Sequence, residues 1–264
     1  MLGPMTLLTP GGSPQGLSFW SAAGICSRKW HYQNERRLSG ELPTFSSPGL
    51  EGKPNNGFVG SLFHAYGQHG MEQKRTFTFD GETPIQGYQQ EEDEAWRLVK
   101  AYKKFYPDWS TPAQSEVDIS LTLHDDFTIT GRVDALVWIE GLLDGCDHYF
   151  QPGLYVWDYK TASSRQSSFV DDYRLQVEGY ALIWNLTHGP EDQVLGGVLD
   201  RITKTKEPQC DRFFVALPTQ RRENHIIETW KGFYLSSKKN SRNLSACVLG
   251  YGGCSFKKRC AAED

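Results

Sequence analysis

The sequence lacks any apolar run that approaches the roughly 20 residues of a membrane-spanning helix. Its first residues, MLGPMTLLTPGGSP, hold neither a basic segment nor a sustained hydrophobic one, so we expect no signal peptide. Repeats and low-complexity tracts are also absent. These absences predict a cytoplasmic protein, whose six cysteines are better suited to be thiols or metal ligands than disulfides.

An excess of positive charge is missing as well. Lys and Arg number 28 against 32 Asp and Glu, which gives a formal net charge of −4. Contact with nucleic acid would therefore have to come from local basic patches. With 264 residues, of which 38% are hydrophobic and 23% charged, the chain is long enough to bury a large core as one globular domain.

The hydrophobic patterns predict an α/β class, with a mixed central β-sheet flanked by helices. Residues 39–57, rich in Pro, Gly and Ser, predict a long loop. The predicted helices cover residues 18–37, 58–70, 91–107, 167–186 and 221–236. The predicted strands form a hairpin over residues 115–139, a strand over 154–160 and a second hairpin over 194–217.

Two of these helices carry an apolar stripe that is expected to face the core. In the helix over 91–107 the stripe consists of Ala95, Leu98, Val99, Tyr102, Phe105 and Tyr106. In the helix over 167–186 it consists of Val177, Tyr180, Ala181 and Trp184.

The strand VWDYK places an acid and a base inside an apolar segment. Alternation puts Asp158 and Lys160 on one face, and Trp157 and Tyr159 on the other. An Asp-x-Lys triplet alone is a common surface pair. On one face of a buried strand, however, the two charges are costly unless they pair, bind a metal or do chemistry.

A second carboxylate lies in the preceding hairpin. In GRVDALVWI the apolar positions Val133 and Ala135 mark the core face, so Asp134 points the opposite way together with Arg132. Two carboxylates from neighbouring strands can hold a hard divalent cation through their oxygens. A lysine beside them can orient or deprotonate a water, or stabilise a charged transition state.

Three further residues accompany this pair. Gln176 and Tyr180 are four residues apart, so they lie on one side of the helix that follows the strand. His64 lies on the predicted helix over 58–70. Taken singly, each could be a packing residue, and a lone histidine is more often structural than a ligand.

The order and spacing of these motifs resemble the PD-(D/E)xK nuclease superfamily, and most of all its RecB-type exonuclease branch, which includes phage-encoded and CRISPR-associated members. The resemblance extends from Cys26 to Cys260. It departs from the family pattern at Val133, where a proline is usual. The motifs are Gly-x-Val-Asp134, Asp158-x-Lys160-Thr161 and Gln176-x-x-x-Tyr180, with His64 upstream.

The resemblance implies a restriction-endonuclease-like core and hydrolysis of DNA phosphodiester bonds, in a bacterial or phage-infected cell. Asp134, Asp158, His64 and the carbonyl of Tyr159 would bind Mg²⁺ or Mn²⁺. Lys160 would position the attacking water, and Gln176 and Tyr180 would orient the substrate strand and the lysine. Glu116 is a further acid, but alternation places it opposite Val117, at what we expect to be a solvated strand edge.

The cysteines at the end of the chain are too widely spaced for common motifs. Cys247, Cys254 and Cys260 match neither a zinc knuckle nor a short ferredoxin run, and on their own could be unrelated thiols. The RecB-type branch often joins one N-terminal and three C-terminal cysteines through an iron–sulfur cluster. The resemblance therefore implies a 4Fe-4S cluster on these three and Cys26, and leaves Cys146 and Cys210 unassigned.

Basic residues adjoin the same cysteines. If a cluster joins the termini, these residues would form one DNA-binding patch on an otherwise acidic chain, with nearby aromatic side chains for stacking on single-stranded DNA. The residues are Arg28, Lys29, Lys257, Lys258 and Arg259. On their own such residues are usually solvated charges.

We therefore predict one nuclease domain over residues 1–264, with a catalytic core at 58–217 and cluster-binding segments at 18–37 and 240–264. The predicted function is that of a metal-dependent DNA exonuclease acting on single strands or duplex ends. One alternative is a non-catalytic DNA-binding subunit of a recombination or CRISPR-adaptation complex, although such a subunit should have lost at least one of Asp134, Asp158 and Lys160. Another is a structural protein held together by zinc.

Overall fold

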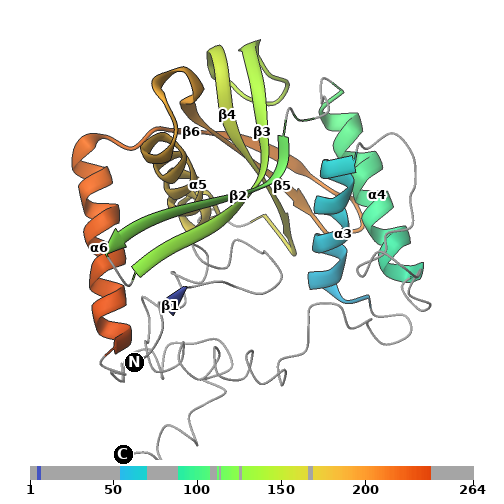
Figure 1. The fold of residues 1–264 in the computed structure, drawn as a ribbon. Coiled ribbons are helices and arrows are strands. Elements are labelled where there is room, and N and C mark those ends of the chain that lie inside the picture. The colour runs from blue at the N-terminus through green and yellow to red at the C-terminus, as the bar shows by residue number, and fades with distance from the viewer. Residues whose placement is uncertain are drawn as a thin grey trace, which may run out of the picture. The chain divides into compact units, whose positions relative to one another are not determined.

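The fold is a mixed six-stranded sheet with helices packed on it (Figure 1). The computed structural model of the protein describes residues 5–6, 54–69, 89–107, 112, 114–124, 127–165 and 169–238. The strands lie in the order β1-β3-β4-β5-β6, and β2 pairs with β3 outside this path. The predicted mixed sheet flanked by helices is thus confirmed. No helix in the described part of the chain is both long and apolar enough to cross a membrane.

The elements follow the predicted order, with two short additions at β1 and at a 3₁₀ helix over Pro190–Asp192. The predicted helix over 18–37 and the segment 240–264 lie outside the described residues. The helices are α3 (Asn56–His69), α4 (Gln89–Phe105), α5 (Phe169–Thr187) and α6 (Gln220–Lys238). The strands are β1 (Met5–Thr6), β2 (Gln114–His124), β3 (Phe127–Leu142), β4 (Tyr149–Ala162), β5 (Val194–Thr203) and β6 (Cys210–Ala216).

The chain divides into two compact units. One holds residues 1–43, 120–131 and 218–264, and the other holds residues 44–119 and 132–217. The predicted catalytic and metal-binding side chains all belong to the second unit. The single nuclease domain and the boundaries of its core stay predictions.

Helix α3 begins inside the predicted loop because Asn55 caps it. The Oδ1 atom of Asn55 accepts hydrogen bonds from the backbone N–H groups of Gly57 (2.9 Å) and Phe58 (3.3 Å). The backbone N–H of Asn55 donates to Oε1 of Glu91 at 2.9 Å. The start of α3 is therefore tied to the first turn of α4.

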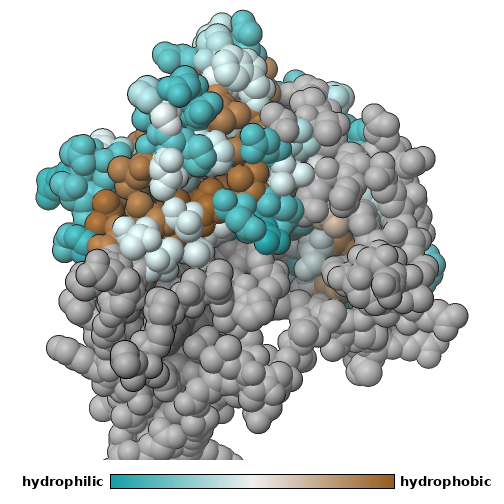
Figure 2. Space-filling view, viewed as in Figure 1, coloured by the Kyte–Doolittle hydropathy of each residue, from teal (hydrophilic) through white to brown (hydrophobic). Residues whose placement is uncertain are grey.

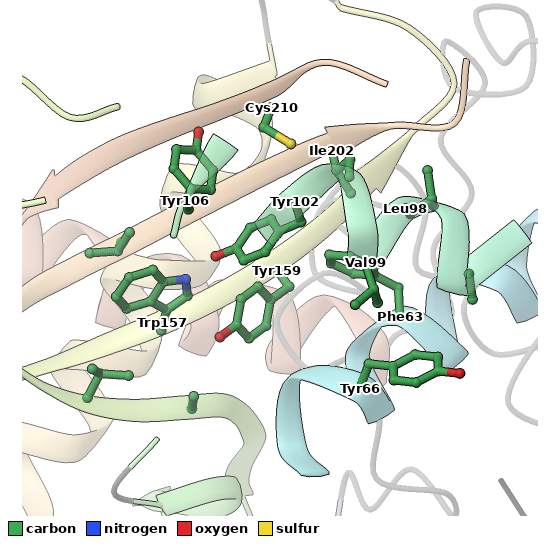
Figure 3. Packing of buried hydrophobic residues seen from close by; sticks show 14 of the residues in the cluster. Phe63, Tyr66, Leu98, Val99, Tyr102, Tyr106, Trp157, Tyr159, Ile202 and Cys210 are labelled. Carbon is green, nitrogen blue, oxygen red and sulfur yellow. The ribbon is translucent and has the colours of Figure 1, made fainter. Parts of the chain in front are cut away.

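Strand β4 is buried on both faces. Trp157 and Tyr159 pack with residues of α3 and α4 in the main hydrophobic core (Figure 3). The opposite face of the sheet meets α5 at Gly197 of β5, where a Cβ would lie 2.2 Å from the Cγ1 atom of Val177. Only glycine lets α5 approach the sheet this closely. Since Val156 pairs with Gly197, the face that carries Val156 is the one that α5 covers.

All residues of the apolar stripe predicted for α5 are buried. The apolar stripe predicted for α4 includes one residue that is not buried. Phe105 is 42% exposed, whereas the other five members of the α4 stripe are buried. Phe105 is the last helical residue, and Tyr106, whose N–H still donates to the carbonyl of Tyr102 at 2.8 Å, takes the buried place. A helical period cannot show where the chain turns out of the helix.

The hairpin of β3 and β4 ends in exposed apolar side chains. Trp138, Leu142 and Tyr149 are each about two-thirds exposed, at 65%, 70% and 66%. Hydrophobic residues reach the surface of the described part among hydrophilic ones (Figure 2). Single exposed apolar residues are normal on a protein surface.

A buried ion pair joins β5 and β6 to α4. Nε of Arg212 donates to Oδ1 of Asp200 at 2.9 Å, and both side chains are almost fully buried. Asp200 also accepts hydrogen bonds from Nε1 of Trp157 (2.9 Å) and from the hydroxyl of Tyr102. The guanidinium of Arg212 lies 3.8 Å from the ring centre of Tyr106. The pairing and the hydrogen bonds offset part of the cost of burying these charges, although burial still raises the pKa of Asp200.

Substitution of Arg212 by Met should destabilise the protein by about 3–5 kcal/mol, because it leaves the carboxylate of Asp200 buried without a cation. Urea unfolding gives the free energy of unfolding. The matched control is Lys231→Met, which removes the cation of the exposed Lys231–Glu228 pair (3.0 Å) and should cost less than about 1 kcal/mol. Equal effects of the two variants would contradict the role given to the buried pair.

Candidate active site

The site forms where β3 and β4 part. The antiparallel ladder between these strands ends at the pair Ala135–Trp157. Beyond it, the backbone N–H of Tyr159 donates to Oδ2 of Asp134 at 2.8 Å, so a side chain takes the place of a strand-to-strand bond. Extension of the same register places Asp134 opposite Asp158. The two carboxylates predicted to meet are therefore neighbours across the opening.

Asp134 is held by two donors. Nδ1 of His64, on α3, lies 3.1 Å from Oδ2 of Asp134, and the Tyr159 N–H bonds the same oxygen. Burial alone would raise the pKa of Asp134, but the charges of His64 and Lys160 and these hydrogen bonds lower it. Burial alone would lower the pKa of His64, and the charge and hydrogen bond of Asp134 raise it instead. The pair is thus stable as imidazolium and carboxylate.

Asp158 is less well satisfied. Its side chain is fully buried, and Nζ of Lys160 lies 2.6 Å from Oδ2. Apart from this ion pair, neither oxygen of Asp158 has a hydrogen-bond partner in the described part of the chain. Burial raises the pKa of Asp158 to about 6, although Lys160 lowers it, and the nearby charge of Asp134 adds to the rise. A buried carboxylate with so few partners is unusual and calls for a cation.

Helix α5 covers this pair with polar and aromatic side chains. Nε2 of Gln176 donates to the hydroxyl of Tyr180 at 2.6 Å, which is the contact expected from their i, i+4 spacing. The Oε1 atom of Gln176 is buried and has no partner among the described residues. Nζ of Lys160 lies 5.4 Å from the ring centre of Tyr173. Burial raises the pKa of Tyr180 well above its usual value, and Asp158 and Asp134 raise it further.

An aromatic cluster fixes β4 behind the carboxylates. The ring of Tyr159 meets those of Phe63, His64 and Tyr102 edge-on, with centres 6.1–6.3 Å apart. Gly67 of α3 lies against the same ring, and a Cβ there would be 3.1 Å from it. Because Tyr159 stands between Asp158 and Lys160 in the chain, its packing sets where both side chains leave the strand.

Glu116 lies nearer to the site than the sequence suggested. The expected position at a strand edge holds, since β2 pairs with β3 off the main path of the sheet, but the side chain is only 31% exposed and its Oε2 lies 3.5 Å from Nη1 of Arg132. Its charge also contributes to the raised pKa of Tyr180. The backbone of Glu116 has a φ of 51°, a conformation that L-residues seldom adopt in a strand. Alternation fails here because that conformation interrupts the period of two.

The residue types that bind a divalent metal are present, but their side chains do not form a complete ligand set among the described residues. No three His, Cys, Asp or Glu side chains of the described residues converge as a ready metal site. His64 and Asp134 do meet, and carboxylate and carbonyl oxygens such as those of Asp134, Asp158 and Tyr159 are ligands of the kind that Mg²⁺ and Mn²⁺ prefer. The under-satisfied Asp158 carboxylate is where such a cation would fit, and it is now occupied on one side by Lys160.

The predicted cluster ligands and basic patch lie outside the described residues. Cys146 and Cys210 are free thiols, the first half-buried and the second buried. Burial raises the pKa of Cys210 to about 12, so this thiol is inert in the core. Both observations are compatible with the prediction, which left Cys146 and Cys210 unassigned.

A family comparison decides the affiliation of the chain. The model of the PD-(D/E)XK nuclease superfamily matches residues 20–261. The chain belongs to this superfamily. The predicted family is therefore confirmed, and the RecB-type branch stays a prediction. Nucleases of this superfamily typically use Mg²⁺ or Mn²⁺ and act on DNA.

One solved structure supports the fold, and a second is similar at a lower score. A candidate exonuclease from Eubacterium rectale is similar with a TM-score of 0.51 at 13% identity, over 89% of this chain and 85% of the other. The protein SSO0001 is similar with a TM-score of 0.47 at 15% identity, over 92% of this chain and 85% of the other. No curated protein sequence matches the chain significantly.

In the absence of metal ions, Asp158→Asn should gain stability relative to the wild type as the pH rises from about 4 to 6. The pKa of Asp158 is raised from 3.8 to about 6 in the folded protein. The folded state then binds this proton more tightly than the unfolded state, so folding loses free energy as the pH rises through this window. The whole window corresponds to about 3 kcal/mol.

Urea unfolding in EDTA at several pH values measures this difference. Lys160 stays charged throughout the range, so the loss of its partner is a constant offset. Asp211→Asn is the control: against the effect of burial, hydrogen bonds from Arg165 and Arg201 lower the pKa of Asp211, so the stability difference between this variant and the wild type should be nearly flat between pH 4 and 6. If the difference in unfolding free energy between Asp158→Asn and the wild type were also constant over this pH range, the pKa of Asp158 would not be raised in the folded protein.

Proposed function

We propose that the protein is a metal-dependent DNA exonuclease of the RecB type, which hydrolyses phosphodiester bonds. The observation that carries this proposal is the pair Asp134 and Asp158 at the opening of the sheet, where Asp158 is buried and, among the described residues, has no polar partner other than Lys160 at 2.6 Å. A stabilising ion pair alone would not leave the remaining oxygen of Asp158 unsatisfied.

The residues that would hold a Mg²⁺ or Mn²⁺ ion are Asp134, Asp158, His64 and the carbonyl of Tyr159. When bound, the ion supplies a Lewis acid that lowers the pKa of a water and offsets charge on the phosphate. His64 and the Tyr159 N–H already orient the carboxylate of Asp134. A cation at this position would replace the ammonium of Lys160 as the main partner of Asp158, and Lys160 would then be able to donate to the substrate.

The remaining side chains act on the substrate and the water. Lys160, with its raised pKa, stays protonated and donates hydrogen bonds to the water and to the phosphate oxygens, where negative charge develops. The Oε1 of Gln176, which has no partner among the described residues, accepts a hydrogen bond from the water. Tyr180, held by Gln176, orients the strand.

The choice of an exonuclease rests on two supports. The order of the motifs resembles the RecB-type branch, and the similar structure from Eubacterium rectale is described as a candidate exonuclease. Its substrate is expected to be single-stranded DNA or duplex ends. The proposed DNA-binding patch at the termini comprises Arg28, Lys29, Lys257, Lys258 and Arg259. Protein partners would come from recombination or CRISPR adaptation.

We also propose a 4Fe-4S cluster bound by Cys26, Cys247, Cys254 and Cys260. Four thiolates are the ligand set that such a cluster needs. The proposal depends on the resemblance of these positions to the RecB-type pattern. A cluster that joins residue 26 to the C-terminal cysteines would close nearly the whole chain into a loop, and its binding free energy would add to folding stability.

Asp134→Ala, Asp158→Ala and Lys160→Ala should each lower cleavage at least about 100-fold, because each removes charge that acts on the transition state. The assay follows end-labelled single- and double-stranded DNA with Mn²⁺. EDTA should stop the reaction and Mg²⁺ or Mn²⁺ should restore it. DNA binding without cleavage should persist in the variants.

The matched control is Glu140→Ala, which removes an exposed carboxylate from the same strand as Asp134 and should cleave as the wild type does. Wild-type cleavage by either aspartate variant would reject the site. A wild-type protein that binds DNA and never cleaves it would instead favour the non-catalytic subunit.

Anaerobically purified protein should be brown, with about four irons and four sulfides per chain. Replacement of any one of Cys26, Cys247, Cys254 and Cys260 by Ala should remove colour and lower the melting temperature together, because cluster binding contributes to folding. Cys146→Ala and Cys210→Ala are the controls and should stay brown. One zinc per chain without iron would reject the iron–sulfur cluster and retain the metal link.

A further inference from the structure

A second group of charges continues from Lys160 across the sheet. In the parallel pairing of β4 and β5, Lys160 is the direct partner of Arg201, and in the antiparallel pairing of β5 and β6, Arg201 is the partner of Asp211. Paired residues share a face, and neighbouring strands are about 4.8 Å apart. Lys160, Arg201 and Asp211 therefore form one row on the face that also carries Asp158.

Two arginines share the carboxylate at the end of this row. Nε and Nη2 of Arg201 donate to Oδ2 of Asp211 at 2.9 and 2.6 Å. Nε of Arg165, just after β4, donates to the same oxygen at 3.1 Å, and its Nη2 donates to Oδ1. The three groups sum to a formal charge of +1, on a face that also carries Lys160.

The two arginines differ in exposure. The side chain of Arg201 is 7% exposed, and its guanidinium lies 5.5 Å from the ring centre of Phe213, so it is fixed in the sheet. The side chain of Arg165 is 56% exposed. Its Nε and Nη2 bind Asp211, and its Nη1 group has no partner among the described residues. The outer edge of the guanidinium, with one N–H of Nη1 and the second N–H of Nη2, thus presents two parallel donors to solvent.

The opposite face of the same strands shows what a purely structural pair looks like. One position away, Arg212 and Asp200 are almost completely buried and are surrounded by Tyr102, Tyr106 and Trp157. That pair offers no donor to solvent. The pair of Arg165 and Asp211 instead reaches the surface, at the end of the row that begins at the candidate catalytic lysine.

We propose that Arg165, oriented by Asp211 and backed by Arg201, binds a backbone phosphate of the nucleic-acid strand next to the phosphate that is cleaved. The inference rests on the proposed nuclease function. A planar guanidinium suits phosphate because it donates two parallel hydrogen bonds. Its contact with Asp211 lies two strands beyond Lys160 and so sets the direction in which the nucleic-acid strand leaves the carboxylates, which makes Arg165 a substrate-positioning residue.

The test measures binding of a short single-stranded DNA to the full chain in EDTA, which prevents cleavage. Arg165→Ala should weaken binding about tenfold or more, the worth of a charge-assisted hydrogen bond, and should flatten the salt dependence by about 0.7 units of slope. With Mn²⁺ it should raise KM and leave kcat near the wild-type value, because the contact is the same in the ground and transition states.

Two further variants make the measurement specific. Lys100→Ala removes an exposed charge from α4 and should bind as the wild type does within about twofold. Arg165→Lys keeps the charge and loses the paired donors, so its salt slope should match that of the wild type while its affinity falls part of the way.

A neutral phosphate identifies the contact. DNA with one methylphosphonate, placed in turn at each position, should bind the wild type less tightly when the neutral group is adjacent to the cleaved phosphate. The affinity of Arg165→Ala should not change when the methylphosphonate is placed at that position. If the wild type cleaves DNA and Arg165→Ala matches Lys100→Ala in affinity and in position dependence, the inference is wrong and the nuclease proposal stands. If the wild type neither binds nor cleaves DNA, both fail.

Discussion

The end of hydrogen bonding between β3 and β4 is the constraint on which the candidate site depends. Past Ala135–Trp157 the two strands part, while β4 stays paired with β5 as far as Ala162. Asp134 then bonds the backbone N–H of Tyr159, which would otherwise be an unpaired donor inside the protein. The same carboxylate therefore satisfies the open strand and faces Asp158, so the position of the site is fixed by the backbone itself.

The sheet separates stability from chemistry between its two faces. On one face, Asp200 and Arg212 are paired, hydrogen-bonded and enclosed by aromatic rings. On the other face, Lys160 is the only polar partner of the Asp158 carboxylate in the part of the chain that the structure describes. A buried polar network whose groups are all hydrogen-bonded stabilises the strands. A buried carboxylate with too few partners is destabilising, and a bound cation would remove part of that cost. Neighbouring residues of the same strands thus contribute to stability on one face and to the candidate active site on the other.

The two candidate metal-binding aspartates differ in pKa although their side chains are identical. Asp134 gains His64 and a backbone donor, which lower its pKa, whereas burial and the charge of Asp134 raise that of Asp158. Two carboxylates this close cannot both be charged at low cost. A divalent cation would relieve that repulsion, which is the electrostatic reason to expect one between them.

The sequence by itself determined the local periods and hence most of the elements. Alternation correctly placed Asp158 and Lys160 opposite Trp157 and Tyr159, and the i, i+4 spacing correctly brought Gln176 to Tyr180. These features depend on residues a few positions apart, so repeat lengths of two and 3.6 suffice to predict them.

Tertiary structure alone decided the features that join distant segments. No period places Asn55 against Glu91, brings Arg165 and Arg201 to one carboxylate, or opens the ladder at Asp134. The same holds for Glu116, whose left-handed backbone turns it out of the alternating pattern. Such contacts depend on strand register and on close approach of helices, which are settled only when the whole sheet packs.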